Sequence, residues 1–249
     1  MSSAAPPRVQ DPAPSTRPSR TPWIVQFYGS ALGKKYAMAI SGIIGLGYIF
    51  AHMVGNLKVY LGAESIDQYG EWLREGLLYP ILPHTVALWL LRLVLIGALV
   101  VHVHAAWSLT VDNRKARSTR YQSNRDYVAA DFAARTMRWT GVIVLLFIGY
   151  HLADLTWGVE AVNPDFVRGA TYDNMAASLA RPAVAAFYLL ANLALGVHIY
   201  HGIWSLFRTM GASNRRLLAS ARPIAIGFTV IVIGGNLTFP IAALTGLIG

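Results

Sequence analysis

The residues of this chain best suited to chemistry are its histidines, and they lie in unusual surroundings. All seven except His84 fall within long apolar stretches; these six are His52, His102, His104, His151, His198 and His201. A polar imidazole ring is costly in such a setting unless it has a partner. One such histidine is most simply an interhelical hydrogen-bond partner. Several together favour a metal centre, because neutral imidazole is a good ligand for iron.

Membrane-spanning helices must position these histidines. The sequence is 55% hydrophobic and 13% charged, with a mean hydropathy of +0.43, whereas a soluble domain carries about twice that charge fraction. A span needs about 20 apolar residues. We therefore predict an all-α bundle of five transmembrane helices, at residues 32–60, 84–111, 136–158, 182–209 and 222–248. These make up one domain at 23–249, after a disordered tail at 1–22. Residues 63–75 are expected to form a short interfacial helix.

The charged residues between the apolar stretches predict the orientation. Most of the 21 Lys and Arg residues fall in the tail and in the second and fourth connections. The others are Lys58, Arg74, Arg92, Arg168 and Arg181. Because basic residues favour the cytoplasmic side, we expect a cytoplasmic N-terminus and an external C-terminus. The net charge of +9 is therefore explained by membrane orientation rather than by nucleic-acid binding.

The histidines fall at two depths. With a rise of about 1.5 Å per residue, His52 and His151 lie about 20–25 Å from the cytoplasmic ends of their helices, and His102 and His198 about 15 Å. We name His52 and His151 the outer pair, and His102 and His198 the inner pair. Two axial imidazoles on one iron are typical of haem that transfers electrons. The spacing therefore predicts two haem groups, each with bis-histidine ligation.

Two further histidines leave an alternative open. His104 and His201 form a competing pair at matched depth, although His102 and His104 lie about 200° apart on their helix and cannot face one centre. An inner iron–sulfur cluster with two histidine ligands is the other alternative. The chain has no cysteine, so a partner chain would have to supply the thiolates. Three basic residues lie where haem propionates would emerge: Lys35, Arg138 and Arg208.

The helix sequences also carry a family resemblance. The first reads KKYAMAISGIIGLGYIFAHMVGNL, the second LIGALVVHVHAAWSL, the third MRWTGVIVLLFIGYHLADLTW and the fourth GVHIYHGIWSLF. From Lys34 to Gly249 the chain resembles the single-chain cytochrome b membrane anchor of succinate dehydrogenase and fumarate reductase, the type with five helices and two haems. The family's Arg-x-Thr-Gly and His-x-x-x-Gly-x-Trp-Ser patterns fall on Arg138, Thr140, Gly141, His198, Gly202, Trp204 and Ser205.

The resemblance implies an electron-transfer subunit in a bacterial inner membrane. His52 and His151 would hold one haem b, and His102 and His198 the other. A flavoprotein and an iron–sulfur subunit would dock on the cytoplasmic side, and the electron acceptor would be a quinone, with menaquinone expected. The chain alone would not be a complete enzyme, and no catalytic residue is assigned. The outer acids Glu64, Asp67 and Glu71 are candidates for proton transfer, although solvated loop charges are the simpler interpretation.

Two rival functions remain at this stage. A cytochrome b subunit of a hydrogenase or formate dehydrogenase also places histidines on several helices, but the order of single ligands on helices one to four fits the succinate dehydrogenase anchor better. A proton-coupled transporter could use intramembrane histidines as relays. That class predicts inverted repeats and broken helices, and the sequence shows no convincing repeat of this kind.

Overall fold

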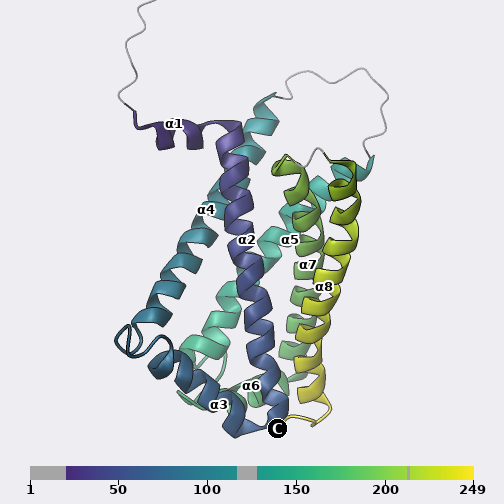
Figure 1. Cartoon of the computed structure of the whole chain (residues 1–249). Helices are drawn as coiled ribbons and strands as arrows, with labels where there is room; N and C mark the ends of the chain where they lie inside the picture. Colours follow the sequence, from purple (N-terminus) through teal and green to yellow (C-terminus); the bar gives the residue numbers. More distant parts are fainter. Residues whose placement is uncertain (1–20, 117–127, 212–213) are drawn as a thin grey trace, which may run out of the picture.

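The computed structural model describes residues 21–116, 128–211 and 214–249, and its regular elements there are helices. The predicted tail falls almost entirely outside the described residues. Within these ranges five helices are long and apolar enough to cross a membrane, which confirms the predicted all-α bundle. They lie side by side, with α1 at one end of the bundle and α3 and α6 at the other (Figure 1).

The five long helices differ from the predicted ranges mainly at their ends. They are α2 (Ala31–Asn56), α4 (Val86–Ala116), α5 (Val128–Leu152), α7 (Pro182–Thr209) and α8 (Arg215–Leu244). The last begins before the predicted 222 because Asn214 caps it: its side chain accepts a hydrogen bond from the Arg216 amide at 2.9 Å. Pro223 therefore lies inside the helix instead of opening it.

Shorter helices complete the chain at both ends of the bundle. The predicted interfacial segment forms α3 (Ala63–Glu71) and a π-helical turn (Trp72–Gly76), after a 3₁₀ turn (Leu57–Leu61) that extends α2. A second π-helical turn (Ala153–Trp157) extends α5 past its buried aspartate. Sequence reasoning missed α1 (Trp23–Gly29) and α6 (Thr171–Leu179), because neither is long or apolar enough to register as a span.

The bundle consists of two helical hairpins, which carry the paired histidines, and a supporting helix. The first hairpin packs α2 on α4, the second packs α5 on α7, and α8 packs along α7. In the described part of the chain α7 and α8 bury the most residues, whereas α4 buries only Ala87 and Ala105. Large apolar side chains such as Leu93 and Val100 face outward from α4, as expected of a helix that contacts lipid.

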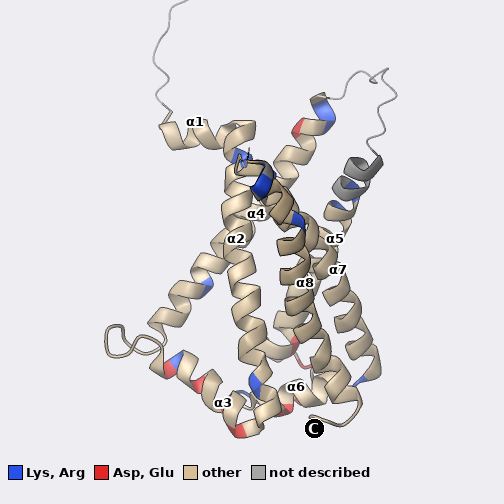
Figure 2. Cartoon of the chain, turned by 45° about the vertical axis from the view of Figure 1, so that its right-hand side comes forward, with Lys and Arg blue, Asp and Glu red and all other residues tan. Residues whose placement is uncertain are grey.

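Charge separates along the bundle axis. Most Lys and Arg residues lie toward the α1 end, with some near α3 and α6, whereas Asp and Glu lie mostly at the α3 and α6 end (Figure 2). At the basic end Lys34 of α2 forms an ion pair with Asp112 of α4 at 2.7 Å. At the acidic end the Asp67 carboxylate accepts a hydrogen bond from the Tyr172 amide at 3.0 Å, which ties α3 to α6. Hydrogen bonding thus gives Asp67 a structural role, while Glu64 and Glu71 are exposed.

One buried carboxylate holds the acidic end together. Asp154 is 0% exposed, and its two oxygens accept hydrogen bonds from the Ser178 hydroxyl at 2.8 and 2.7 Å. Arg181 forms an ion pair with it at 3.5 Å, and the Asn163 amide donates to its backbone carbonyl at 3.2 Å. The network therefore joins the end of α5 to the loop that follows it, to α6 and to the start of α7.

Substitution of this carboxylate tests the importance of the network for stability. We expect Asp154→Ala to lower the free energy of unfolding by about 2–4 kcal/mol, because buried donors lose a charged acceptor. Unfolding of the purified protein in mixed micelles, followed by circular dichroism, measures the change. Asp165→Ala removes an exposed loop carboxylate and should cost under about 0.5 kcal/mol. Equal losses in the two variants would contradict the role given to Asp154.

Candidate metal centres

Four of the predicted ligands come together in two pairs. His52 of α2 faces His151 of α5, with ring centroids 5.8 Å apart and planes at 82°. His102 of α4 faces His198 of α7, with centroids 6.3 Å apart and planes at 61°. These are the same two pairs that the depths along the helices grouped. Each pair takes one ring from each hairpin, so a centre held by both rings would bridge the hairpins.

The separation of the rings suits a single metal between them. An imidazole nitrogen binds a metal at about 2.0 Å and the ring centre lies about 1.1 Å behind it, so two trans imidazoles have centres about 6.2 Å apart. The inner pair, at 6.3 Å, matches this value, and the outer pair, at 5.8 Å, is slightly closer. Among the described residues no group of three or more metal-binding side chains gathers, so two protein ligands per centre is the available set.

The inner pair is held from behind by matching contacts. His102 Nδ1 lies 3.2 Å from both the Ser41 hydroxyl and the Met38 carbonyl of α2. His198 Nδ1 lies 3.3 Å from the Thr140 hydroxyl of α5. Both hydroxyls donate their proton to a carbonyl one turn back in their own helix, so they accept from the imidazole. Each Nδ1 therefore carries the proton, which leaves Nε2 unprotonated and able to bind a metal.

These supporting residues recur in the sequence as a direct repeat. Met38, Ser41, Gly42 and His52 of α2 have the same mutual spacing as Met137, Thr140, Gly141 and His151 of α5. Each glycine lies against the ring of a histidine of the inner pair: a Cβ would come within 3.6 Å of His102 at Gly42 and 3.4 Å of His198 at Gly141. Sequence reasoning looked for inverted repeats and missed this one, although the spacing alone reveals it.

The outer pair has a different environment. His151 Nδ1 lies 3.3 Å from the Tyr188 hydroxyl of α7, and that hydroxyl donates to Asp154 at 2.7 Å. His52 stacks on Tyr48, one turn earlier in α2, at 5.3 Å. The Asn56 amide lies 3.3 Å from His52 Nε2. Because that amide occupies the nitrogen that would face a metal, Asn56 must release it before His52 can become a ligand through Nε2.

The competing histidines take other positions. His104 is exposed, and its Nδ1 lies 2.5 Å from the hydroxyl of Tyr28, a residue of α1. His201 packs edge-on against Tyr200, and its Nδ1 is buried without a hydrogen-bond partner in the described part of the chain. No ring contact between His104 and His201 occurs among the described residues. His84 is hydrogen-bonded to the Glu75 carbonyl at 2.6 Å, outside the spans.

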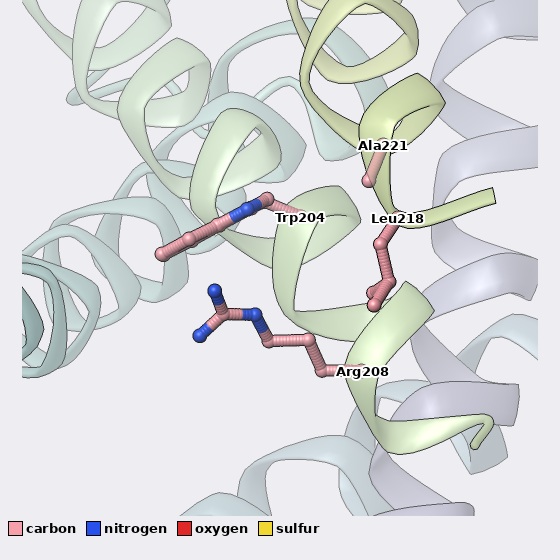
Figure 3. Close-up of a pocket in the computed structure, with 4 residues that line it drawn as sticks. All are labelled: Trp204, Arg208, Leu218 and Ala221. Atoms are coloured by element: carbon pink, nitrogen blue, oxygen red, sulfur yellow. The ribbon is translucent and has the colours of Figure 1, made fainter. Parts of the chain in front are cut away.

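The basic residues lie at the α1 end of the bundle. Lys35 and Arg138 are exposed, within one helical turn of Met38 and Met137. Arg208 stacks on Trp204, with its guanidinium carbon 4.2 Å from the ring centre. These two side chains line a pocket of about 330 Å³ with Leu218 and Ala221 of α8 (Figure 3). The Arg208 and Trp204 side chains extend together to the same side of α7 (Figure 3).

Comparison with known proteins identifies a relative with a known role. The chain is 26% identical over 176 residues to the succinate dehydrogenase cytochrome b558 subunit of Bacillus subtilis (strain 168). The aligned region covers 70% of this chain and 77% of that protein. No family model matches the chain, and no solved structure matches it significantly. The relative confirms the resemblance that the helix patterns predicted: this membrane protein is similar to the cytochrome b subunit of succinate dehydrogenase.

Proposed function

We propose that this chain is the membrane anchor and electron-transfer subunit of a succinate:quinone oxidoreductase, and that it holds two haem b groups. The observation that carries the proposal is the meeting of two imidazole pairs at two depths, each at a separation that suits one metal. Two protein ligands suit haem, because the porphyrin supplies the other four. The similarity to a succinate dehydrogenase cytochrome b558 subunit supports the choice of enzyme.

The protein residues hold and orient the two centres. His102 and His198 would supply both axial ligands of the inner haem, and His52 and His151 those of the outer one. Haem iron with two axial imidazoles supplies reversible one-electron transfer. Ser41, Thr140 and Tyr188 keep the ring nitrogens oriented from behind.

The partners follow from the orientation of the bundle. We place the basic α1 end in the cytoplasm, as the positive-inside rule favours. The flavoprotein and iron–sulfur subunits would dock there and deliver electrons to the inner pair, and the outer pair would pass them to a quinone, which we expect to be menaquinone. The exposed acids Glu64 and Glu71 lie at the opposite end.

Single substitutions of the histidines test the ligand assignment. We expect His52→Ala, His102→Ala, His151→Ala and His198→Ala each to lose one of two haems, because the iron loses an axial ligand. His104→Ala and His201→Ala serve as matched controls and should keep both. Haem content per chain, measured on purified complex, decides the assignment. Loss of haem in a control with retention in its neighbouring variant would move the ligand to the control position.

The electron donor distinguishes the proposed complex from its rivals. Purified from its native membrane, the chain should bring with it a flavoprotein and an iron–sulfur protein, and succinate should reduce its haem bands. Reduction by hydrogen or formate instead, with a nickel or molybdenum partner, would favour the other cytochrome b class. Absence of haem bands would leave the transporter as the better function.

Reporter fusions test the orientation. A periplasmic alkaline phosphatase fused after Gly249 should be active, because the C-terminus is expected outside the cytoplasm. The same enzyme fused after Ala116 should be inactive. Green fluorescent protein at these two positions should give the opposite pattern. Phosphatase activity at Ala116 with fluorescence at Gly249 would invert the proposed topology.

A further inference from the structure

The outer pair differs from the inner pair in the groups that contact the Nδ1 atoms of its histidines. At the inner pair each imidazole contacts neutral oxygens: the Ser41 hydroxyl and Met38 carbonyl behind His102, and the Thr140 hydroxyl behind His198. His151 instead contacts Tyr188, whose hydroxyl is bonded to the carboxylate of Asp154. Among the described residues, His151 is the only one of the four proposed ligands that a single hydrogen-bonded side chain connects to a carboxylate.

The direction of these hydrogen bonds follows from the number of protons. The Tyr188 hydroxyl has one proton, and an ionised carboxylate can only accept, so the proton points to Asp154 at 2.7 Å. The Tyr188 oxygen is then free to accept from His151 Nδ1 at 3.3 Å. The proton on His151 is thereby fixed at Nδ1, and Nε2 keeps the lone pair that faces His52.

The carboxylate itself is held rigidly. Asp154 and Ser178 are both 0% exposed, and Ser178 donates to both carboxylate oxygens. Arg181, which is anchored to the Val162 carbonyl at 2.7 Å, balances the charge from the solvent side. Tyr188 is 5% exposed and packs edge-on against Phe147 at 5.1 Å. The hydroxyl therefore has a fixed position relative to the His151 ring.

We propose that Tyr188, held by Asp154, is a positioning residue that lowers the reduction potential of the outer centre. An Nδ1–H that donates toward an anion-backed oxygen makes the imidazole a stronger electron donor through Nε2. A stronger donor stabilises the oxidised iron more than the reduced iron. This inference rests on the proposed function, because it takes His151 to be a haem ligand.

Redox titration of the intact complex tests this role. Tyr188→Phe keeps the ring and removes the hydroxyl, and we expect the reduced-to-oxidised ratio of the outer haem to rise about tenfold at fixed potential, which equals about 59 mV for one electron. The inner haem should not change. The titration component that is missing in the His151→Ala complex is assigned to the outer haem, and the one missing in His102→Ala to the inner haem. Asp154→Asn, which removes the charge but keeps an acceptor for Tyr188, should shift the outer haem in the same direction.

Tyr150→Phe is the matched control. Tyr150 lies in the same ring cluster, 6.2 Å from Tyr188, but is not hydrogen-bonded to His151. Removal of the Tyr150 hydroxyl should leave the reduction potentials of both haems unchanged. An unchanged outer potential in Tyr188→Phe, or an equal shift in Tyr150→Phe, would overturn the inference. If Tyr188→Phe does not retain the outer haem, an unchanged outer potential in Asp154→Asn overturns it. Wild-type complex without haem would refute the proposed function itself, so the two failures are distinguishable.

Discussion

An imidazole in the apolar interior of a membrane protein has two nitrogens, and both need a partner. In this chain three of the four paired histidines meet that constraint from behind, through a hydrogen bond at Nδ1 to a hydroxyl on a neighbouring helix. Those bonds fix which nitrogen carries the proton and where the other points. The arrangement of the bundle can be understood as the means of placing those hydroxyls: Ser41 and Thr140 at one level, Tyr188 at the other.

The bundle meets this requirement with two similar hairpins and one asymmetric end. In both hairpins a helix that begins near the basic end carries a hydroxyl, a glycine and then a histidine of the outer pair at the same spacing. The returning helix brings the histidine of the inner pair against that hydroxyl and glycine. At the acidic end the symmetry is lost, because Asp154 of the second hairpin is bonded to α6 and to the loop before it. This difference gives the two histidine pairs different electrostatic surroundings.

Much of this arrangement could be predicted from the sequence, for identifiable reasons. The spans follow from apolar length, and the two ligand pairs follow from counting residues from the charged ends of straight helices, since the rise per residue is constant. The role of Ser41 and Thr140 could have been predicted from the direct repeat. The contacts of Tyr188, Asn56 and Asp154 could not. They depend on rotation about the helix axis and on the path of loops, which neither hydropathy nor spacing specifies, and the same holds for α1 and α6.

The haem content of the purified complex tests the central claim most directly, because it measures the centres without reference to any electron donor. The two imidazole pairs predict two haem b groups for each copy of this chain, determined as the pyridine haemochrome against quantified protein. A ratio of two agrees with iron bound between both pairs. A ratio of zero would contradict the account as a whole, and a ratio of one would show that one of the two histidine pairs does not hold haem.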